Sequence, residues 1–313
     1  MSTIFFNLAK VSLILLLVLG CTTPISTSTA ALPTVVEPTF TSLAPNSSPT
    51  VITNILTQTL TIDEYQYMME CSGEGSLVVL LLGGRVEAWK PIQAEINRFT
   101  RTCVFEHIGN SPTPLIAEPI ANNVHTLLKD GEVTGPYVVV GFSVGGYIAR
   151  LFTNSYPEEV AGMVLLDSSH EDQNARFLAA LSSETSKECQ DLKDYRTQLQ
   201  GPHFVPIAPQ ITLDFDASAT QVRAVEQNLG NLPLVVLTAG RSEWPDCFQP
   251  EVQQQLDQAW RDMQADLASL STNSTYLVAE ESSHSFTEKP GMVIDAIQRV
   301  IQVVQGKEGG SMP

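Results

Sequence analysis

Positive charge is scarce in this sequence. Its 313 residues include 17 lysines and arginines against 34 aspartates and glutamates, so the formal net charge is −17. A chain with this balance repels a phosphate backbone, and we therefore expect no nucleic-acid partner. The hydrophobic fraction of 43% is ordinary for a globular protein, so the acidity bears on partners rather than on the fold.

The apolar run near the N-terminus is too short to span a membrane. Val11–Gly20 follows Lys10, falls short of the roughly 20 residues of a transmembrane helix, and is typical of a signal-peptide core. The stretch Val18–Cys21, "VLGC", resembles a bacterial lipobox, in which the cysteine is lipidated. We therefore expect residues 1–20 to be a lipoprotein-type signal peptide and Cys21 to carry a lipid anchor in the bacterial cell envelope. A plain secretory signal is the alternative, and both place the protein outside the cytoplasm.

Charge is almost absent from residues 21–54, which are rich in threonine, serine and proline. Such a composition cannot bury a core, so this segment is predicted to be a flexible tether between the membrane and a folded domain. We expect that domain to span residues 55–306 and residues 307–313 to form a flexible tail.

Cysteine is also scarce. Four cysteines follow Cys21, and they are neither closely spaced nor accompanied by histidines, so no zinc or other metal site is expected. An oxidising compartment permits disulfides, and four cysteines leave three pairings open. The four residues are Cys71, Cys103, Cys189 and Cys247.

Buried strands alternate with helices through most of the domain. Continuous apolar runs separated by stretches of helical periodicity predict a mostly parallel sheet with helices on both faces. The alternation stops in the polar residues 168–230, which we interpret as a helical cap inserted over the carboxyl ends of the strands. The runs predicted as buried strands are Ser76–Gly84, Thr102–Ile108, Gly135–Phe142, Ala161–Asp167, Pro233–Gly240 and Ser274–Glu280.

A G-x-S-x-G motif, Gly141 to Gly145, lies between a predicted strand and a predicted helix. A sharp strand-to-helix turn strains the backbone of its serine and needs small neighbours, so that strand and helix can approach each other. The turn also presents the hydroxyl at a helix N-terminus, where free N–H groups favour developing negative charge. We therefore predict that Ser143 is a catalytic nucleophile.

A serine nucleophile needs a base, and the sequence contains five histidines. His284 is the best candidate, because it lies in a polar loop between the last predicted strand and the last predicted helix. His170 is the alternative, since it opens the cap and could line a pocket. The remaining histidines are predicted to be structural: His107, His125 and His203.

The base in turn needs a carboxylate that holds its tautomer and stabilises its charged form. We predict Asp167 for this role, because it directly follows the predicted strand that comes after the serine. Glu243 and Asp246, just after the next predicted strand of the alternation, are the alternatives. Each choice keeps the chain order serine, acid, histidine.

An oxyanion hole needs two N–H donors. Val144, the residue after the nucleophile, supplies one. The glycines that end the first parallel strand let the backbone face the pocket, so the second donor is predicted to be Gly84, or its neighbour Gly83.

From about Tyr65 to Val304 the sequence resembles the α/β-hydrolase fold superfamily. The resemblance implies the sheet of that fold, of the eight-stranded type, with the helical cap. It also implies a serine esterase-like hydrolase that forms an acyl-enzyme from a small-molecule acyl substrate and uses no cofactor. The segments that carry it are Val138–Gln173 ("VVVGFSVGGYIARLFTNSYPEEVAGMVLLDSSHEDQ"), Pro233–Gly240 ("PLVVLTAG") and Ser282–Phe286 ("SSHSF").

Two other functions remain open under this resemblance. One is a non-catalytic binding lipoprotein on the same fold. The other is an amidase or peptidase, because one triad serves all of these hydrolases. The oligomeric state is not predicted.

The resemblance also implies a cysteine pairing. In this fold the second strand runs antiparallel beside the strand that carries Cys103, so Cys71 and Cys103 are expected to form a disulfide. With that pairing, the resemblance leaves Cys189, in the cap, and Cys247 as the second pair.

Overall fold

A computed structural model describes residues 55–62, 65–111, 113–181, 189–225, 228–285 and 289–306. The expected signal peptide (1–20), the lipidated Cys21, the rest of the tether (to residue 54) and the tail (307–313) lie outside the described residues.

A single eight-stranded sheet organises the described residues, in the order β1-β2-β4-β3-β5-β6-β9-β10. Strand β2 runs antiparallel to both of its neighbours, and the six strands from β4 to β10 are parallel. This confirms the predicted fold class. The strands are β1 (Ile55–Ile62), β2 (Tyr65–Ser72), β3 (Val78–Leu82), β4 (Arg101–Ile108), β5 (Tyr137–Phe142), β6 (Val160–Leu166), β9 (Leu234–Ala239) and β10 (Ser274–Ala279).

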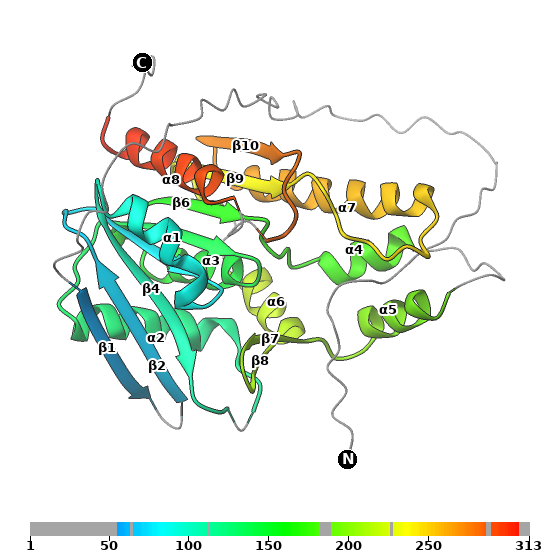
Figure 1. Cartoon of the computed structure of the whole chain (residues 1–313), viewed down its shortest axis with the longest axis horizontal. Helices are drawn as coiled ribbons and strands as arrows, with labels where there is room; N and C mark the ends of the chain where they lie inside the picture. Colours follow the sequence, from blue (N-terminus) through cyan, green and yellow to red (C-terminus); the bar gives the residue numbers. More distant parts are fainter. Residues whose placement is uncertain are drawn as a thin grey trace.

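Helices cover both faces of the sheet, which is why its central strands are apolar on both sides (Figure 1). In β3, Val78, Leu80 and Leu82 join one buried cluster, whereas Val79 and Leu81 join the other, as the two-residue period of a strand requires. Residues of α1 (Val86–Ile96) and α8 (Pro290–Val304) pack into the second cluster. The first cluster is covered by α2 (Ala117–Asp130), α3 (Gly145–Ser155), α6 (Phe215–Ala224) and the end of α7 (Pro250–Ala268), and a short 3-10 helix, η1 (Pro157–Glu159), precedes β6.

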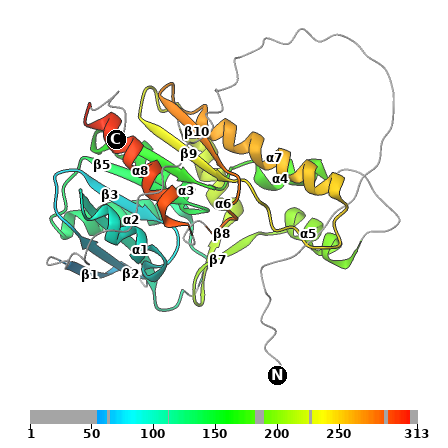
Figure 2. The ribbon, with the colours of Figure 1, turned by 45° about the horizontal axis from the view of Figure 1, so that its top comes forward.

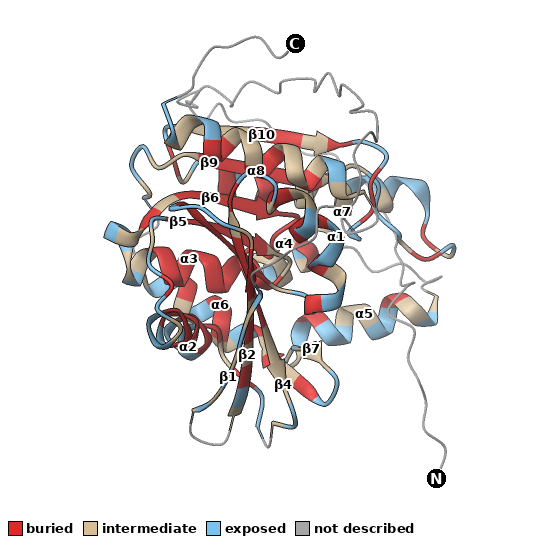
Figure 3. Cartoon of the chain, turned by 60° about the vertical axis from the view of Figure 1, so that its left-hand side comes forward, coloured by how far each residue is buried: buried red, intermediate tan, exposed pale blue. Residues whose placement is uncertain are grey.

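Burial is concentrated in the central strands and in the helix faces that contact them (Figure 3). All five residues of β3 are buried, whereas β1 alternates exposed and partly buried residues at the edge of the sheet. The polar side chains buried at the carboxyl ends of the central strands therefore stand out against an apolar interior.

The inserted cap is not entirely helical, which corrects our prediction. It contains α4 (Gln173–Ala180) and α5 (Gln190–Gln200), followed by an antiparallel hairpin of β7 (Phe204–Ala208) and β8 (Ile211–Asp214). Pro206 lacks an N–H and disrupts a helix interior, but an edge strand tolerates it. Figures 1 and 2 show α4 and α5 beyond the carboxyl ends of β6 and β9, where the cap was expected.

Two disulfides link segments that are far apart in the chain. Cys71 and Cys103 face each other across the β2–β4 pair, and their sulfurs are bonded. The second disulfide joins Cys189, at the start of α5, to Cys247, in the loop before α7. These are the pairs that the resemblance implies.

No helix in the described ranges is both long and apolar enough to cross a membrane. The same residues contain no cluster of three or more histidine, cysteine or acidic side chains able to hold a metal ion.

Candidate active site

Ser143 occupies a strained turn between β5 and α3. Its φ of 52° lies in the left-handed region, which a serine adopts only where the surrounding structure holds it. Backbone hydrogen bonds supply that support: the N–H of Ser143 donates to the carbonyl of Leu166, and the N–H of Ser169 donates to the carbonyl of Ser143. The nucleophile predicted from the motif is thus fixed to the end of the neighbouring strand, β6.

The motif glycines allow close approach around this turn. A Cβ atom on Gly141 would lie 2.7 Å from the Cα of Gly146, and one on Gly145 would lie 2.3 Å from the carbonyl oxygen of Leu82. Both distances are shorter than two non-bonded heavy atoms can approach. Any larger residue would therefore push α3 away from β5 or from β3, and would displace Ser143 with it.

Asp167 follows β6 directly and is 3% exposed. Its Oδ1 accepts hydrogen bonds from Thr238 Oγ1 at 2.9 Å, from the backbone N–H of Ala239 at 3.0 Å and from Trp260 Nε1 at 2.8 Å. Its Oδ2 lies 2.6 Å from Nδ1 of His284. One carboxylate oxygen is thus saturated by fixed donors, and the other is reserved for the histidine.

Burial alone would raise the pKa of Asp167. The hydrogen bond and charge of His284, with the donors on Oδ1, outweigh burial and hold the pKa below its ordinary value. Asp167 is therefore ionised at neutral pH. An ionised carboxylate on Nδ1 of His284 favours the tautomer that leaves Nε2 free to accept a proton.

The imidazole of His284 is 55% exposed and stacks on Phe142, with ring centroids 4.9 Å apart. Ser143, Asp167 and His284 line one cavity of about 250 Å³. No hydrogen bond joins the Ser143 hydroxyl to His284 among the described contacts. Such bonds are often long in unliganded enzymes and tighten when substrate binds.

The predicted oxyanion residues lie beside this turn. Gly83 and Gly84 both have φ of 84°, a conformation that glycine adopts without strain. The indole of Trp89 donates to the Gly83 carbonyl at 2.6 Å. The backbone N–H groups of Gly84 and Val144 make no hydrogen bond within the described part of the chain, so both are free to bind an oxyanion.

The segment after Gly84, the predicted oxyanion residue, is also held from β4. The Glu106 carboxylate accepts from the Val86 backbone N–H at 3.0 Å and from Arg85 Nε at 3.1 Å. These bonds tie the start of α1 to the neighbouring strand. They fix the course of the chain just after Gly84.

Comparisons with known proteins bear on the fold. No family model matches the chain. The uncharacterized protein YqjL of Bacillus subtilis is 27% identical over 224 residues, which cover 70% of this chain and 79% of that protein. An esterase structure from Thermogutta terrifontis, 19% identical, matches 80% of this chain and 99% of its own with a TM-score of 0.52. The α/β-hydrolase domain-containing protein 10 from mouse, 14% identical, matches 80% and 99% with a TM-score of 0.53.

The chain has the α/β-hydrolase fold. In this fold the strand ends that carry Ser143 and Asp167 are adjacent, because β5 and β6 pair in parallel. The site thus lies at the carboxyl edge of the sheet, where open α/β sheets bind their ligands.

Within the described part of the chain, Asp167 is the predicted acid that contacts His284, whereas Glu243 and Asp246, the two alternatives, do not. Glu243 lines the cavity but is exposed and pairs with Arg241 at 3.8 Å. Asp246 is exposed in the same loop. His284 therefore has Asp167 as its hydrogen-bonded carboxylate among the described contacts.

His170, the alternative base, is buried and 5% exposed. Its Nδ1 accepts from the backbone N–H of Asp172 at 3.0 Å, and burial lowers its pKa. His125 is also engaged elsewhere, since its ring lies 2.9 Å from Glu159 and stacks on Tyr156. Neither histidine lines the cavity that contains Ser143.

Two residues of the site were missed in the sequence. Thr238 on β9 and Trp260 on α7 both donate to Asp167, although they lie 71 and 93 residues away from it. Trp260 also stacks on Phe177 of α4, with centroids 6.0 Å apart, and both rings line the cavity with Trp244. A tryptophan within an otherwise polar stretch of a helix was the available signal, but nothing in the sequence connects it with the carboxylate.

Proposed function

We propose that this protein is a serine hydrolase that cleaves an ester bond of a small acyl substrate through an acyl-enzyme. One observation carries the proposal: the ionised Asp167 holds His284 at 2.6 Å, in the cavity that the strained Ser143 also lines. The fold match to an esterase structure is consistent with this function, but it rests on 19% identity and bears on the fold alone.

The mechanism follows from the placement of these groups. Ser143 Oγ attacks the acyl carbonyl while Nε2 of His284 takes its proton, and the N–H groups of Val144 and Gly84 bind the oxyanion. Collapse of the intermediate breaks the ester bond, and His284 returns the proton to the departing alcohol. Water, deprotonated by His284, then attacks the acyl-enzyme, and His284 passes that proton to Ser143 Oγ as the acyl–Oγ bond breaks and the acid leaves. Asp167 stays ionised and stabilises the imidazolium in both halves.

A labelling experiment tests the proposal on the full chain. A fluorophosphonate, which phosphonylates only an activated serine, should label the wild type and lose its target in Ser143→Ala. Hydrolysis of p-nitrophenyl butyrate should fall in the same variant by at least about 10³-fold. Ser269→Ala, an exposed serine at the end of α7, is the matched control and should behave as wild type.

A binding protein on the same fold is the second candidate. The absence of a hydrogen bond between the Ser143 hydroxyl and His284 in the described contacts favours it. A folded wild type that is neither labelled nor active would support this candidate and refute the hydrolase. Turnover of amides at rates comparable to esters would instead indicate an amidase or peptidase.

We further propose that the protein is anchored outside the cytoplasm through Cys21. The two disulfides support this location, because structural disulfides persist in oxidising compartments. Cells expressing the wild type should carry the protein in the membrane fraction. Cys21→Ser should release it or leave its signal peptide uncleaved.

A further inference from the structure

A second cavity lies on the other side of the nucleophile turn. It is bounded by β2, β4, α2, the first turn of α3 and the cap hairpin, and it reaches Gly83, Gly84 and Val144. Ser143 and Val144 are consecutive residues, yet Ser143 lines the cavity of His284 and Val144 lines this one. The candidate oxyanion donors, Gly84 and Val144, thus line the second cavity next to the turn of Ser143.

The proposed mechanism indicates which part of the substrate each cavity holds, and the inference therefore rests on the proposed function. His284 must return its proton to the departing alcohol, so the alcohol leaves on the side of His284. The carbonyl oxygen lies between the N–H groups of Gly84 and Val144. The acyl chain then extends to the remaining side, into the second cavity.

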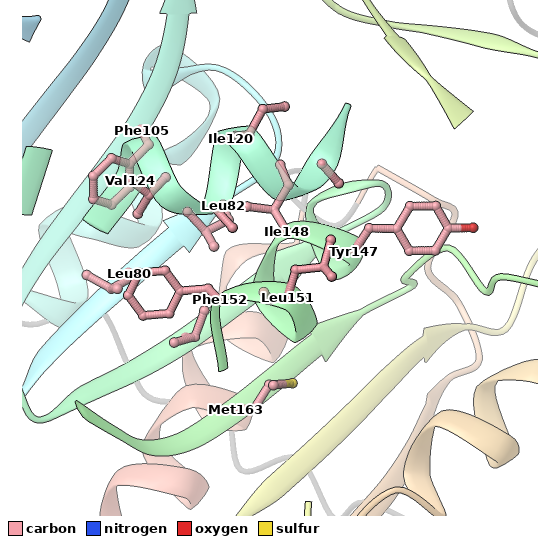
Figure 4. Packing of buried hydrophobic residues seen from close by; sticks show 14 of the residues in the cluster. Leu80, Leu82, Phe105, Ile120, Val124, Tyr147, Ile148, Leu151, Phe152 and Met163 are labelled. Atoms are coloured by element: carbon pink, nitrogen blue, oxygen red, sulfur yellow. The ribbon is translucent and has the colours of Figure 1, made fainter. Parts of the chain in front are cut away.

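The walls of the second cavity suit a short apolar chain. Its volume is about 40 Å³, a few times the roughly 10–15 Å³ needed to hold one water, so it can hold only a short chain. Apolar side chains from several strands and helices form the wall. Those that Figure 4 shows are Leu82, Phe105, Ile120, Val124 and Ile148.

Three polar side chains, those of Tyr67, Glu106 and His107, interrupt this apolar lining, and the first two are hydrogen-bonded. His107 on β4 lines the cavity, and its Nε2 is buried without a hydrogen-bond partner in the described part of the chain. Its ring packs edge-on against Tyr67, directly opposite on β2, with centroids 4.5 Å apart. A buried nitrogen left without a partner calls for an explanation, and its place in a substrate cavity supplies one.

The chemistry of the partner follows from the state of this imidazole. Burial lowers the pKa of His107 to about 4, so the ring is neutral at pH 7. A neutral ring nitrogen is a donor or an acceptor depending on the tautomer, and a hydroxyl satisfies either. A carboxylate would gain no ion pair from the neutral ring, so burying its charge there would be costly. The cavity therefore favours an uncharged hydroxyl.

We propose that the second cavity binds the acyl part of the substrate as a short hydroxylated chain, and that His107 is the specificity-determining residue that hydrogen-bonds its hydroxyl.

The test compares pairs of esters that differ only in that hydroxyl. p-Nitrophenyl esters of 2- and 3-hydroxybutanoic acid are compared with those of 2- and 3-methylbutanoic acid, in which a methyl group replaces the hydroxyl. The measurement is kcat/KM of the full-length protein. The wild type should prefer the hydroxy ester of at least one pair by roughly 5- to 150-fold, the range expected when a buried group gains or lacks its partner.

His107 variants separate a specific contact from a general effect. His107→Leu should abolish the preference, chiefly by lowering kcat/KM for the hydroxy ester, while the methyl ester reacts as fast or faster. His107→Gln, which keeps a hydrogen-bonding group, should retain part of the preference. His125→Leu removes a histidine that does not line the cavity, and it should leave the ratio unchanged.

Two results would overturn the inference without touching the proposed function. In one, the wild type hydrolyses hydroxy and methyl esters equally well in both pairs, which would mean that Nε2 is merely hydrated. In the other, His107→Leu changes both esters equally. Loss of all turnover and labelling in the wild type would instead refute the hydrolase itself.

Discussion

The substitution Asp167→Asn probes the donor arrangement around the carboxylate. Three donors, from Thr238, Ala239 and Trp260, converge on Oδ1. The asparagine must therefore place its carbonyl oxygen there, and its NH₂ group then occupies the position of Oδ2 and faces Nδ1 of His284. Because NH₂ only donates, Nδ1 must accept and the ring proton moves to Nε2. In that tautomer His284 cannot take the proton of the serine.

The three hydrogen bonds at Oδ1 determine how strongly one orientation of the asparagine amide is favoured. In the reverse orientation the NH₂ group would face the three donors, and all three hydrogen bonds would be lost. At about 1 kcal/mol for each bond, the cost is roughly 3 kcal/mol. That is a factor of about 150, so about 99% of molecules hold the unproductive orientation. The orientation alone therefore lowers kcat by about 150-fold. Loss of the negative charge that stabilises the imidazolium brings the expected fall to about 10⁴-fold.

The assay is p-nitrophenyl butyrate hydrolysis at pH 7, with circular dichroism to confirm folding. Asp246→Asn makes the same chemical change at an exposed alternative acid and should retain full activity. The reasoning is refuted if Asp167→Asn keeps more than about a tenth of wild-type kcat while folded. Loss of activity in Asp246→Asn instead would transfer the role to that residue.

Two further predictions concern stability. Trp260→Phe keeps the aromatic ring but removes the N–H donor to a charged carboxylate, so urea denaturation should give a free energy of unfolding lower by about 1.5–3 kcal/mol; equal stability would mean that the indole bond contributes nothing. Burial alone would raise the pKa of Glu171, but its two-pronged contact with Arg150 lowers it to about 2. The stabilisation is thus complete above about pH 4.5 and is lost as the pH falls toward 2. Glu171→Gln should be less stable at pH 7 and should depend less on pH between 4.5 and 2; an unchanged pH dependence would contradict this assignment.

The central sheet could be predicted because its strands are buried on both faces. Runs such as Val78–Leu82 are apolar at every position, and that pattern fits few structures other than an interior parallel strand. The hairpin of Phe204–Ala208 and Ile211–Asp214 was missed, because it is short and amphipathic and lies in a polar segment. Its pairing depends on contacts with the rest of the domain, including a bridge from Leu115 to Leu213.

In the candidate site, too, the residues that depend on their sequence neighbours could be predicted, whereas those that depend on distant contacts could not. Ser143 and its glycines were recognisable because a tight turn imposes its demands on adjacent residues. Asp167 could be placed at a strand end, but the choice between it and two other carboxylates needed the fold. The roles of Trp260 and of the unpaired Nε2 of His107 could not be inferred from the sequence, because each depends on contacts with residues of other elements.

The three tryptophans of the chain all lie around the proposed active site. Trp89 donates to the Gly83 carbonyl, Trp260 donates to Asp167, and Trp244 lines the cavity of Ser143. The tryptophan emission of the protein therefore arises from around the proposed active site, with no distant indole to dilute the signal. Occupation of either cavity should change that emission, so the unlabelled protein is its own optical sensor for ligand screening and for stopped-flow measurements of acylation.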